Sequence, residues 1–501
     1  MRTKKAIFNS TASLLLQFVN VISGFILPQM IISAFGSEVN GAASSVAQFL
    51  GYISLLEAGV GGVTRAALFR PLAQNDTQKI SGIVNATQAF FRKLAYIFLA
   101  YSLLLAVGFK YISRSGLDWS YTFALVLILS ISTFAQYFFG ITNSIILQAD
   151  QLSYIPSVIQ IVAVILNTML AVLLLKLGCG FLMVKFVTAA IFTVKPAILN
   201  YIVCRRYKLD RAAPPDYDAI SQRWNGLGQH LAFFVHNNTD VMVITLFMGL
   251  KWVSVYSVYC MILNGVRNIV KSLTGSAEAA FGNMIAREEK QVLQNRFCMM
   301  ETLTSMIVVS FFSTAAMLLF DFLRIYTREF RDMDYIILPV GILFVLSEAL
   351  HSIKQTYHSL VLAAGHYKET QTSAFIEAGV NLVLSVALVF QWGVAGVLAA
   401  TIVSTIYKII YYVFYLKRNI LFRPVHVFLK RMGTDILCAA SVILVCRAVP
   451  FPAVNNYFEW VVKAVPVFGI SGCIVLAWNV ALYKKDVTSL FQKVTAALRR
   501  S

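Results

Sequence analysis

The chain has 501 residues, of which 58% are hydrophobic and only 13% are charged, and its mean hydropathy is +0.72. A soluble protein carries about 25% charged residues, so this composition excludes a soluble globular protein. The net charge is +19. Because most of the lysines and arginines fall in short polar loops, we attribute this charge to loops at a membrane surface and predict no nucleic-acid partner.

Apolar runs recur about every 30 residues, and each is long enough to cross a lipid bilayer, which takes roughly 20 residues. Runs such as LVLILSIS do not alternate between apolar and polar residues, which argues against an outer-membrane barrel. We therefore predict an all-α polytopic membrane protein with about 14 transmembrane helices. The predicted spans are residues 8–34, 41–64, 90–109, 119–147, 154–175, 180–203, 224–249, 252–274, 298–322, 335–364, 372–391, 394–416, 433–449 and 460–483.

An even number of spans places both ends of the chain on the same side of the membrane. With a cytoplasmic N-terminus, 29 lysines and arginines fall in cytoplasmic segments and 9 in the opposite loops, while Lys185, Lys195, Lys354 and Lys408 lie inside spans. Cytoplasmic loops are enriched in these residues, so we predict that both termini are cytoplasmic. No small-residue cleavage site follows the first apolar stretch, which we interpret as an uncleaved span.

The stretch from Gln48 to Arg70 combines an apolar helix with polar features. Glu57 lies inside the apolar run, a cluster of three glycines follows it, and Arg65 comes next. An acid in lipid is costly, so it is expected to face a protein interior or a wet cavity. The glycines allow a neighbouring helix to approach closely or the helix to bend. This stretch is therefore predicted to be a transmembrane helix that lines a polar space.

The two halves of the chain resemble each other at an offset of roughly 213 to 216 residues. Four segments recur in the same order, namely FGSEVNGAASSV at 35–46 as MGLKWVSVYSVY at 248–259, NDTQKI at 75–80 as EEKQVL at 288–293, LQADQLSY at 147–154 as LAAGHYKE at 362–369, and KLGCGFLMVKFVTAAIF at 176–192 as QWGVAGVLAATIVSTIY at 391–407. The offset spans six helices, an even number, which predicts two parallel repeats around a central space, a plan typical of transporters. The predicted parts are an N-terminal six-helix bundle (1–205), a cytoplasmic linker (206–223), a C-terminal six-helix bundle (224–418), and an extra helix pair with a cytoplasmic tail (419–501).

Polar residues at helical spacing inside several spans predict a wet interior. In the tenth span, Glu348, His351 and His358 share one face, with Lys354 beside them. The cations predicted to bind an anionic substrate in this cavity are Arg65, Lys195, Arg267, Lys271, Lys354 and Lys408. The residues predicted to line the cavity or to couple transport to an ion are Glu57, Asp240, Glu348, His351, His358 and Glu377.

Each of these residues also has a structural interpretation. Arg65, Arg267 and Lys271 lie towards the predicted cytoplasmic ends of spans, where long side chains can extend to the surface. The two histidines are also compatible with packing, and the acids in the seventh, tenth and eleventh spans with structural ion pairs. Spacing alone leaves both interpretations open.

The sequence contains no pattern for a metal site, a nucleotide site or a soluble catalytic domain. The seven cysteines are scattered and form no C-x-x-C pair. The P-loop pattern G-x-x-x-x-G-K-[ST] does not occur, so we do not expect ATP to drive the protein directly. The loops are too short to hold an extramembrane domain. We predict a protein that is not an enzyme and needs no cofactor.

Several segments resemble one transporter family. SLLEAGVGGVTRAAL at 54–68 resembles the second helix of bacterial polysaccharide and O-antigen flippases, which carry an acid, Gly-x-Gly and a following arginine. AFGSEVNGAASSVAQFLGYISLL, LQADQLSY, LAAGHYKE and WGVAGVLAATIVS resemble other parts of the same multidrug/oligosaccharidyl-lipid/polysaccharide exporter superfamily. The resemblance covers about residues 1–418, and the extra C-terminal pair fits the superfamily's fourteen-helix members. One departure is Glu57, where the family pattern has an aspartate.

The resemblance implies a flippase for undecaprenyl-diphosphate-linked oligosaccharide in the bacterial cytoplasmic (inner) membrane, working by alternating access through a cationic lumen. A lumen with several lysines and arginines favours an anion such as diphosphate. The implied partners are the bilayer, a polysaccharide polymerase and glycosyltransferases. A lipid II flippase and a cation-coupled multidrug exporter remain alternatives. A membrane glycosyltransferase or polymerase would need clustered acids near a large outer loop, and neither is visible.

Overall fold

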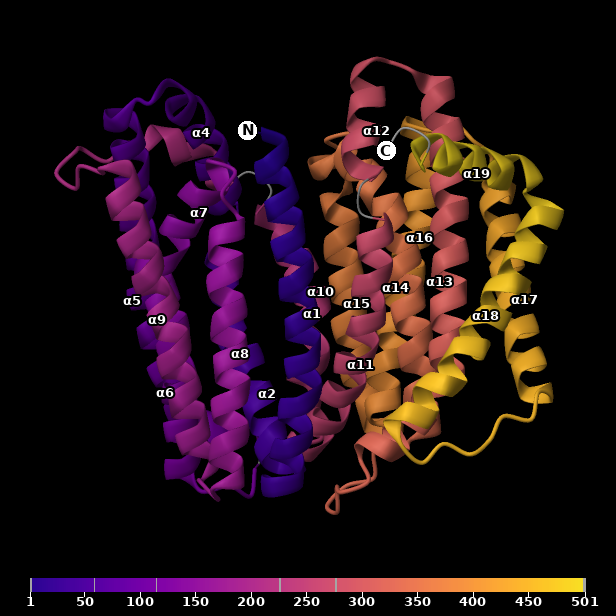
Figure 1. Ribbon diagram of the computed structural model, residues 1–501, viewed down its shortest axis with the longest axis horizontal. Helices are drawn as coiled ribbons and strands as arrows, with labels where there is room; N and C mark the ends of the chain where they lie inside the picture. Colours follow the sequence, from indigo (N-terminus) through magenta and orange to yellow (C-terminus); the bar gives the residue numbers. More distant parts are fainter. Residues whose placement is uncertain (1, 58, 114, 225–226, 275–276, 499–501) are drawn as a thin grey trace. The chain divides into compact units, whose positions relative to one another are not determined.

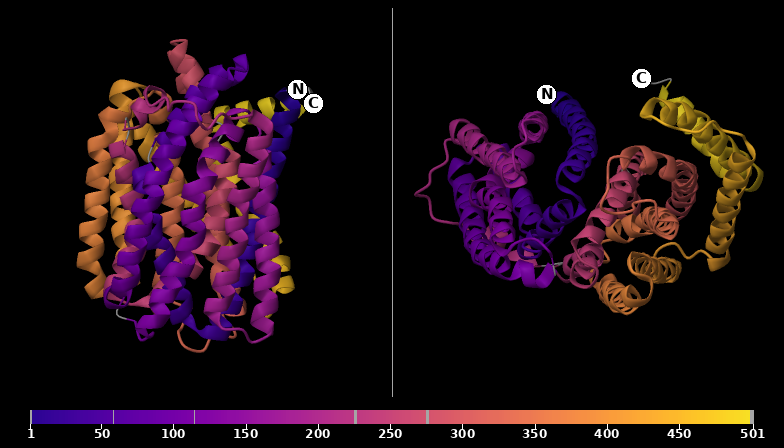
Figure 2. Two further views of the ribbon diagram at one scale, coloured as in Figure 1. Left: turned by 90° about the vertical axis from the view of Figure 1, so that its left-hand side faces the viewer. Right: turned by 90° about the horizontal axis from the view of Figure 1, so that it is seen from below.

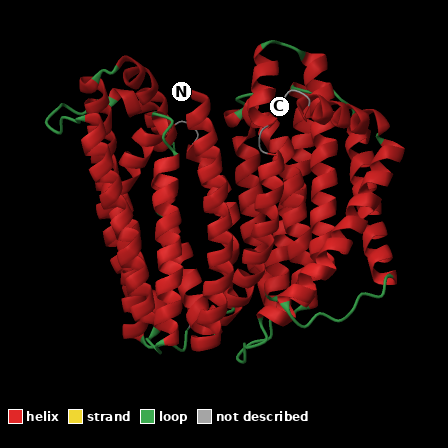
Figure 3. Cartoon of the chain, in the orientation of Figure 1, coloured by secondary structure: helices red, strands yellow, loops and turns green. Residues whose placement is uncertain are grey.

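The computed structural model describes residues 2–57, 59–113, 115–224, 227–274 and 277–498 (Figure 1). Helices account for nearly all of the described chain, and Figure 3 shows short loops between them and no strand in that part. A helix satisfies its backbone hydrogen bonds internally, which is the condition for crossing lipid. The apolar runs of the sequence therefore become long helices.

The chain divides into two compact units, which are described here separately. Unit 1 comprises Met1–Ser257 and Phe330–Met333, and unit 2 comprises Val258–Glu329 and Asp334–Ser501. The elements of unit 1 are α1 (Arg2–Phe35), α2 (Ser37–Gly51), α3 (Ser54–Glu57), α4 (Val60–Gln74), α5 (Thr77–Ser113), α6 (Trp119–Ala135), the π-helical turn η1 (Gln136–Gly140), α7 (Ile141–Ala149), α8 (Tyr154–Lys176), α9 (Phe181–Tyr207), the 3-10 turn η2 (Asp218–Trp224), α10 (Leu227–Phe247) and the start of α11 (Leu250–Thr274).

Unit 2 contains the rest of α11 and the C-terminal helices. Its elements are α12 (Ala277–Ala286), α13 (Lys290–Tyr326), α14 (Leu338–Ala363), α15 (Tyr367–Trp392), α16 (Val394–Asn419), α17 (Val425–Ala448), α18 (Tyr457–Leu482) and α19 (Lys484–Leu498). The long helices of each unit run side by side in the views of Figure 2.

Each of the fourteen predicted spans falls on a helix or on helices joined end to end. Ten helices in the described part of the chain are long and apolar enough to cross a membrane, and α2–α3 with α4 add an eleventh if they form one bent span. Neither α14 nor α17 is among them, because polar and charged residues make these two helices less apolar. The predicted all-α, multi-pass membrane fold is confirmed.

The polar connections at 65–90 and 275–297, for which amphipathic helices at the inner membrane surface are predicted, are helical over most of their described residues. The third predicted span, 90–109, lies within the 37-residue α5, and the ninth, 298–322, lies within the 37-residue α13. Hydropathy alone places the start of a span where the apolar run begins, but a helix continues as long as its backbone bonds do. These two helices therefore extend beyond the apolar part that defines the span.

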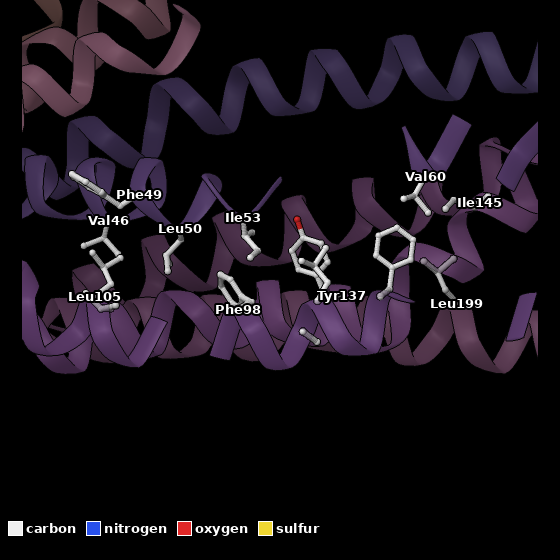
Figure 4. Close-up of a cluster of buried hydrophobic side chains, with 14 of the residues drawn as sticks. Val46, Phe49, Leu50, Ile53, Val60, Phe98, Leu105, Tyr137, Ile145 and Leu199 are labelled. Carbon is white, nitrogen blue, oxygen red and sulfur yellow. The ribbon is translucent and has the colours of Figure 1, made fainter. Parts of the chain in front are cut away.

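The core of unit 1 lies between the broken helix α2–α4 and α5. In Figure 4, Val46 and Leu50 of α2 face Phe98 and Leu105 of α5, and all four side chains are buried. Tyr137, from the π-helical turn η1, lies in the same cluster. Two irregular elements thus meet in this core. The helix is interrupted between α3 and α4, and the π-helical turn η1 is wider than an α-helix. π-Helical turns often mark functional sites.

The internal repeat is visible in the backbone. Five pairs of residues with positive φ recur 213 to 215 positions apart: Gly36 and Gly249, Asn75 and Glu288, Gln151 and Gly365, Gly178 and Gly393, Lys208 and Phe422. Positive φ is uncommon outside glycine. The same helix pairs also pack in both halves, with α5–α6, α6–α9 and α8–α9 corresponding to α13–α14, α14–α16 and α15–α16. The two halves therefore follow the same path.

The compact units do not end at the predicted linker. Residues after α9 pack on unit 1, where Asn85 donates to the carbonyls of Asp210 and Ala213. α10 also belongs to unit 1, because it packs against α2 and α5. The division into two six-helix bundles at 206–223 stays a prediction.

The turn between α7 and α8, within the repeated segment LQADQLSY, joins three helix ends. Lys5 of α1 donates to the Asp150 carbonyl at 2.9 Å and to its carboxylate at 3.2 Å. Tyr207 at the end of α9 donates to the same carboxylate at 2.7 Å, and Arg206 lies 3.7 Å from it. Asn9 of α1 also bonds the backbone of this turn. Asp150 therefore fastens the start of α1 and the end of α9 to one point.

We expect Asp150→Asn to lower the free energy of unfolding by about 1 kcal/mol, because it weakens one partly exposed ion pair and its hydrogen bonds. Thermal unfolding in detergent measures this change. Lys5→Met is expected to lower stability similarly. The double variant is expected to lose less than the sum of the two, because both changes break the same interaction. Strictly additive losses would show that the two residues act independently.

Candidate functional site

Unit 2 contains a buried group of three charged side chains from neighbouring helices. Lys354 of α14 lies 2.7 Å from one carboxylate oxygen of Glu377 on α15, and Lys408 of α16 lies 3.8 Å from the other. Lys354 and Glu377 are each 6% exposed and Lys408 is 2% exposed. We call these three residues the lysine–glutamate cluster. Their sequence separation hides this proximity, which arises because α14 and α15 both pack on α16.

Neighbours one helical turn away complete the surroundings of the cluster. On α15, Ser373 accepts a hydrogen bond from Lys408 at 2.8 Å. On α16, the ring of Tyr412 lies 4.9 Å from the Lys408 ammonium, within cation–π range. The Tyr412 hydroxyl in turn lies 2.7 Å from Nδ1 of His358 on α14. Residues four apart share a helix face, so each helix presents two polar groups to the others.

The electrostatics of the cluster favour an anion. With all three groups ionised it carries a net charge of +1 inside the protein. Burying a charge costs several kcal/mol unless it is paired, and the second lysine here shares its acid with the first. Ionisable residues inside membrane spans generally mark a transport path. An anion with several oxygens can satisfy both ammonium groups.

A second ion pair lies on the same helix. Arg267 of α11 is 3.1 Å from Glu348 of α14 and is about one-third exposed. His351, one turn further along α14, is half-buried. Lys271 of α11 is exposed. The structure thus brings together three predicted residues in the lysine–glutamate cluster, with His358 beside them, and pairs two others. It leaves Lys271 at the surface.

The predicted residues of unit 1 are separate from one another. Lys195 of α9 donates to Gln160 of α8 at 2.8 Å. Glu57 accepts a hydrogen bond from Tyr137 of η1 at 3.1 Å, and Asp240 accepts one from Tyr256 at 2.9 Å. Arg65 of α4 is exposed. In each of the three hydrogen bonds named here, the partner of the charged residue is a neutral side chain.

Unit 2 contains a second buried charged group, around the start of α17, that the sequence pattern did not reveal. Arg423, in the loop before α17, donates two hydrogen bonds to Glu301 of α13, at 2.6 and 2.7 Å. Arg431 of α17 is 3% exposed and lies 3.6 Å from Asp435. Both arginines belong to the segment Lys417 to Arg431 that is counted as cytoplasmic; the structure pairs each of them with an acid, and α17 starts eight residues before the predicted span at 433. The spacing of Arg431 and Asp435, one helical turn, was the available signal.

The described residues include no group of three or more His, Cys, Asp or Glu side chains that could hold a metal ion. The side chains described above instead offer ammonium and guanidinium groups. Their chemistry suits the binding of oxyanions.

The chain is similar in structure to several solved transporters. It matches the lipid II flippase MurJ, in an inward closed conformation, with a TM-score of 0.70 and 15% identity over 96% of this chain and 100% of that one. An inward-facing multidrug resistance MATE family transporter of the MOP superfamily gives 0.58 and 14%, over 82% and 98%. The MATE multidrug transporter DinF-BH gives 0.58 and 17%, over 83% and 97%. No protein-family model and no curated protein sequence matches the chain.

At these identities the likeness establishes the fold. The chain has the polytopic helical fold of the MurJ and MATE transporters. The match to MurJ leaves only a small part of this chain uncovered, so it takes in C-terminal helices that follow the twelve repeated spans. The fold that the sequence resemblance implies is thereby supported.

Proposed function

We propose that this protein is a flippase for polyprenyl-diphosphate-linked oligosaccharide, such as a polysaccharide or O-antigen repeat unit. It moves this lipid from the inner to the outer leaflet of the bacterial cytoplasmic membrane by alternating access. Both termini are cytoplasmic in this proposal. A polymerase and glycosyltransferases that handle the same lipid are the proposed partners.

The observation that carries the proposal is the lysine–glutamate cluster inside a transporter fold. Lys354 and Lys408 share Glu377 as their acid. In the proposed cycle, diphosphate oxygens replace the Glu377 carboxylate at both ammonium groups after the helices separate. Glu377 pairs with both lysines again when the lipid leaves. The lysines are therefore never buried without an anion. Arg267, partly exposed beside Glu348, attracts the diphosphate first.

A second candidate within the same chemistry is lipid II. The match to MurJ, whose name describes a lipid II flippase, covers more of this chain than the MATE matches do. Lipid II also carries a diphosphate on a polyprenyl tail, so the same cations serve both substrates. The two candidates differ in the sugar portion.

The remaining candidate is a multidrug exporter, as the MATE proteins are named. Export of cationic drugs needs an excess of acids at the site. The lysine–glutamate cluster has two bases for one acid, which disfavours a cation at that place. The drug exporter is therefore our third choice.

The proposal is tested by translocation in proteoliposomes. The intact protein is reconstituted with a labelled polyprenyl-diphosphate oligosaccharide, with labelled lipid II, and separately with a cationic dye. We expect the first lipid to reach the opposite leaflet, with and without a proton or sodium gradient. Arg267→Ala, Lys195→Ala and Lys408→Ala are expected to reduce this transport, because each removes a cation that meets the diphosphate.

Lys271→Ala is the comparison variant, because the sequence predicts this lysine to bind substrate whereas the structure leaves it exposed and outside the lysine–glutamate cluster. Thermal unfolding of every variant separates lost transport from lost folding. Transport of lipid II alone would reassign the sugar portion. Efflux of the dye with no movement of either lipid would rule out the flippase and support the drug exporter.

A further inference from the structure

The buried charged group around α17 consists of Arg423, Glu301, Arg431 and Asp435. It differs from the lysine–glutamate cluster because several of its polar atoms have no hydrogen bond in the described structure. Arg431 donates one hydrogen bond, to the Thr302 carbonyl of α13 at 3.0 Å, and its guanidinium lies 4.4 Å from the ring of Tyr483. Its Nε and Nη1 atoms are buried and have no hydrogen-bond partner in the described structure. Asp435 accepts one hydrogen bond, from Ser305 of α13 at 2.7 Å.

Asp435 is also the least compensated of the buried acids. Among the side chains that the structure describes, its Oδ1 is the one buried carboxylate oxygen without a hydrogen bond. The nearest cationic nitrogen, Nε of Arg431, lies 3.6 Å away, beyond hydrogen-bonding distance.

Two other buried acids in unit 2 have closer partners. Glu301 receives two hydrogen bonds from Arg423 and another from Tyr357. Glu377 lies between two ammonium groups. Asp435 has no hydrogen bond at Oδ1, and its ion-pair partner Arg431 lies 3.6 Å away without donating to it. Part of the cost of burying its charge is therefore uncompensated, and a bound proton removes that part.

We propose that Asp435 is a proton-binding site, and that its protonation controls how firmly α17 is held on α13 during the transport cycle. A proton adds to the unbonded Oδ1, and the carboxylate becomes a neutral acid. Arg431 keeps its charge and loses its acidic partner. The control of transport rests on the proposed function, whereas the proton site itself does not.

The groups that face Asp435 come from every element packed around it. Those that line the same small cavity are Arg431 on α17 itself, Glu301, Thr304 and Ser305 on α13, and Tyr357 on α14. Charged and titratable groups lie next to these: Arg423 before α17 donates to Glu301, Tyr483 after α18 contacts the Arg431 guanidinium, and Asp486 on α19 accepts from Thr302. The small cavity lined by Asp435, Arg431, Thr304, Glu301 and Tyr357 has space for about one water molecule. In this proposal, a water molecule in that space passes the proton to Oδ1.

α14 connects this site with the lysine–glutamate cluster. Tyr357 donates to Glu301 in the group around α17. Lys354 lies three residues before Tyr357 on the same helix and contacts Glu377 of α15. His358 lies one residue after Tyr357 and contacts Tyr412 of α16. A change in the packing of α13 and α17 is therefore carried to the proposed substrate site by a single helix. This is the physical link between proton binding and substrate release.

Infrared difference spectroscopy tests the proton site on the full chain in lipid nanodiscs. A fall in pH is expected to produce the carbonyl band of a buried protonated carboxyl group. Labelling all aspartates with ¹³C at the side-chain carboxyl is expected to shift this band, and this test requires no substitution. A band that ignores the label belongs to a glutamate and overturns the proposal.

Variants then identify the residue. The band is expected to disappear in Asp435→Asn and to return in Asp435→Glu. Asp240→Asn is the matched control, since Asp240 is equally buried in a helix but has a tyrosine donor at 2.9 Å. If the band is lost in Asp240→Asn and persists in Asp435→Asn, the proton binds to Asp240 on α10, and the proposal is wrong.

A transport measurement tests the coupling. In proteoliposomes, Asp435→Asn is expected to keep gradient-independent exchange of the lipid and to lose its acceleration by a pH gradient. Full acceleration in this variant contradicts the coupling. If the unsubstituted protein moves no lipid at all, the proposed function fails, while the infrared result still decides whether Asp435 binds a proton.

Discussion

Gly41→Ala is expected to prevent unit 1 from packing. Gly41 lies on α2, in the first repeated segment, and a Cβ atom there would lie 1.7 Å from the backbone carbonyl oxygen of Leu250. Backbone atoms cannot move aside as side chains do, so the helices must separate. The neighbouring bond from Asn40 to Ser254, at 2.8 Å, would then break as well. We expect a loss of about 3 kcal/mol or more in the free energy of unfolding.

Thermal unfolding and the yield of monodisperse protein measure this loss. Gly24→Ala on α1 is the matched control, because a Cβ atom at that position has no neighbour within 4 Å. Alanine favours helix over glycine by about 1 kcal/mol, so the control is expected to keep or gain stability. Equal behaviour of the two variants would mean that α2 does not approach Leu250 this closely.

Glu377→Gln is expected to be the most damaging substitution in unit 2. It leaves Lys354 and Lys408 buried with no acid between them. Removing one partner of a buried ion pair costs about 3–5 kcal/mol, and here one acid serves two lysines. We expect a large fall in the unfolding temperature and loss of transport.

A triple variant separates the structural role of the cluster from its role in transport. Lys354→Met, Glu377→Leu and Lys408→Met together replace the charges with apolar side chains of similar length. Such replacements are often neutral or stabilise by about 1–4 kcal/mol. We expect stability to return and lipid translocation to stay lost, because the anion-binding groups are gone. Recovery of translocation in this stable variant would show that the cluster only supports the fold.

The sequence predicted the repeated segments without indicating their structural purpose. In the structure, four of the five positive-φ pairs fall inside those segments, at Gly36 and Gly249 for example. Turn residues must adopt particular backbone angles, so they remain recognisable when the helices between them diverge. The repeat therefore survives most clearly at helix ends, where local conformation limits the choice of residue.

The candidate site was only partly accessible to sequence reasoning. Lys354, Glu377 and Lys408 were identified because charge inside an apolar run is conspicuous. Their grouping depends on which faces of three helices meet, and spacing along one helix cannot show that. Arg423 and Arg431 were assigned to a cytoplasmic surface because they precede an apolar run, yet both pair with acids in the protein.

The sequence by itself determined that this chain is a multi-pass helical membrane protein with an internal repeat. Lipid imposes that result, since apolar runs of sufficient length must form helices there. Only the tertiary structure decided which charges are buried together and which remain at a surface, as with Lys408 and Lys271. The cost of a buried charge depends on partners from other helices, and those partners are far away in the sequence.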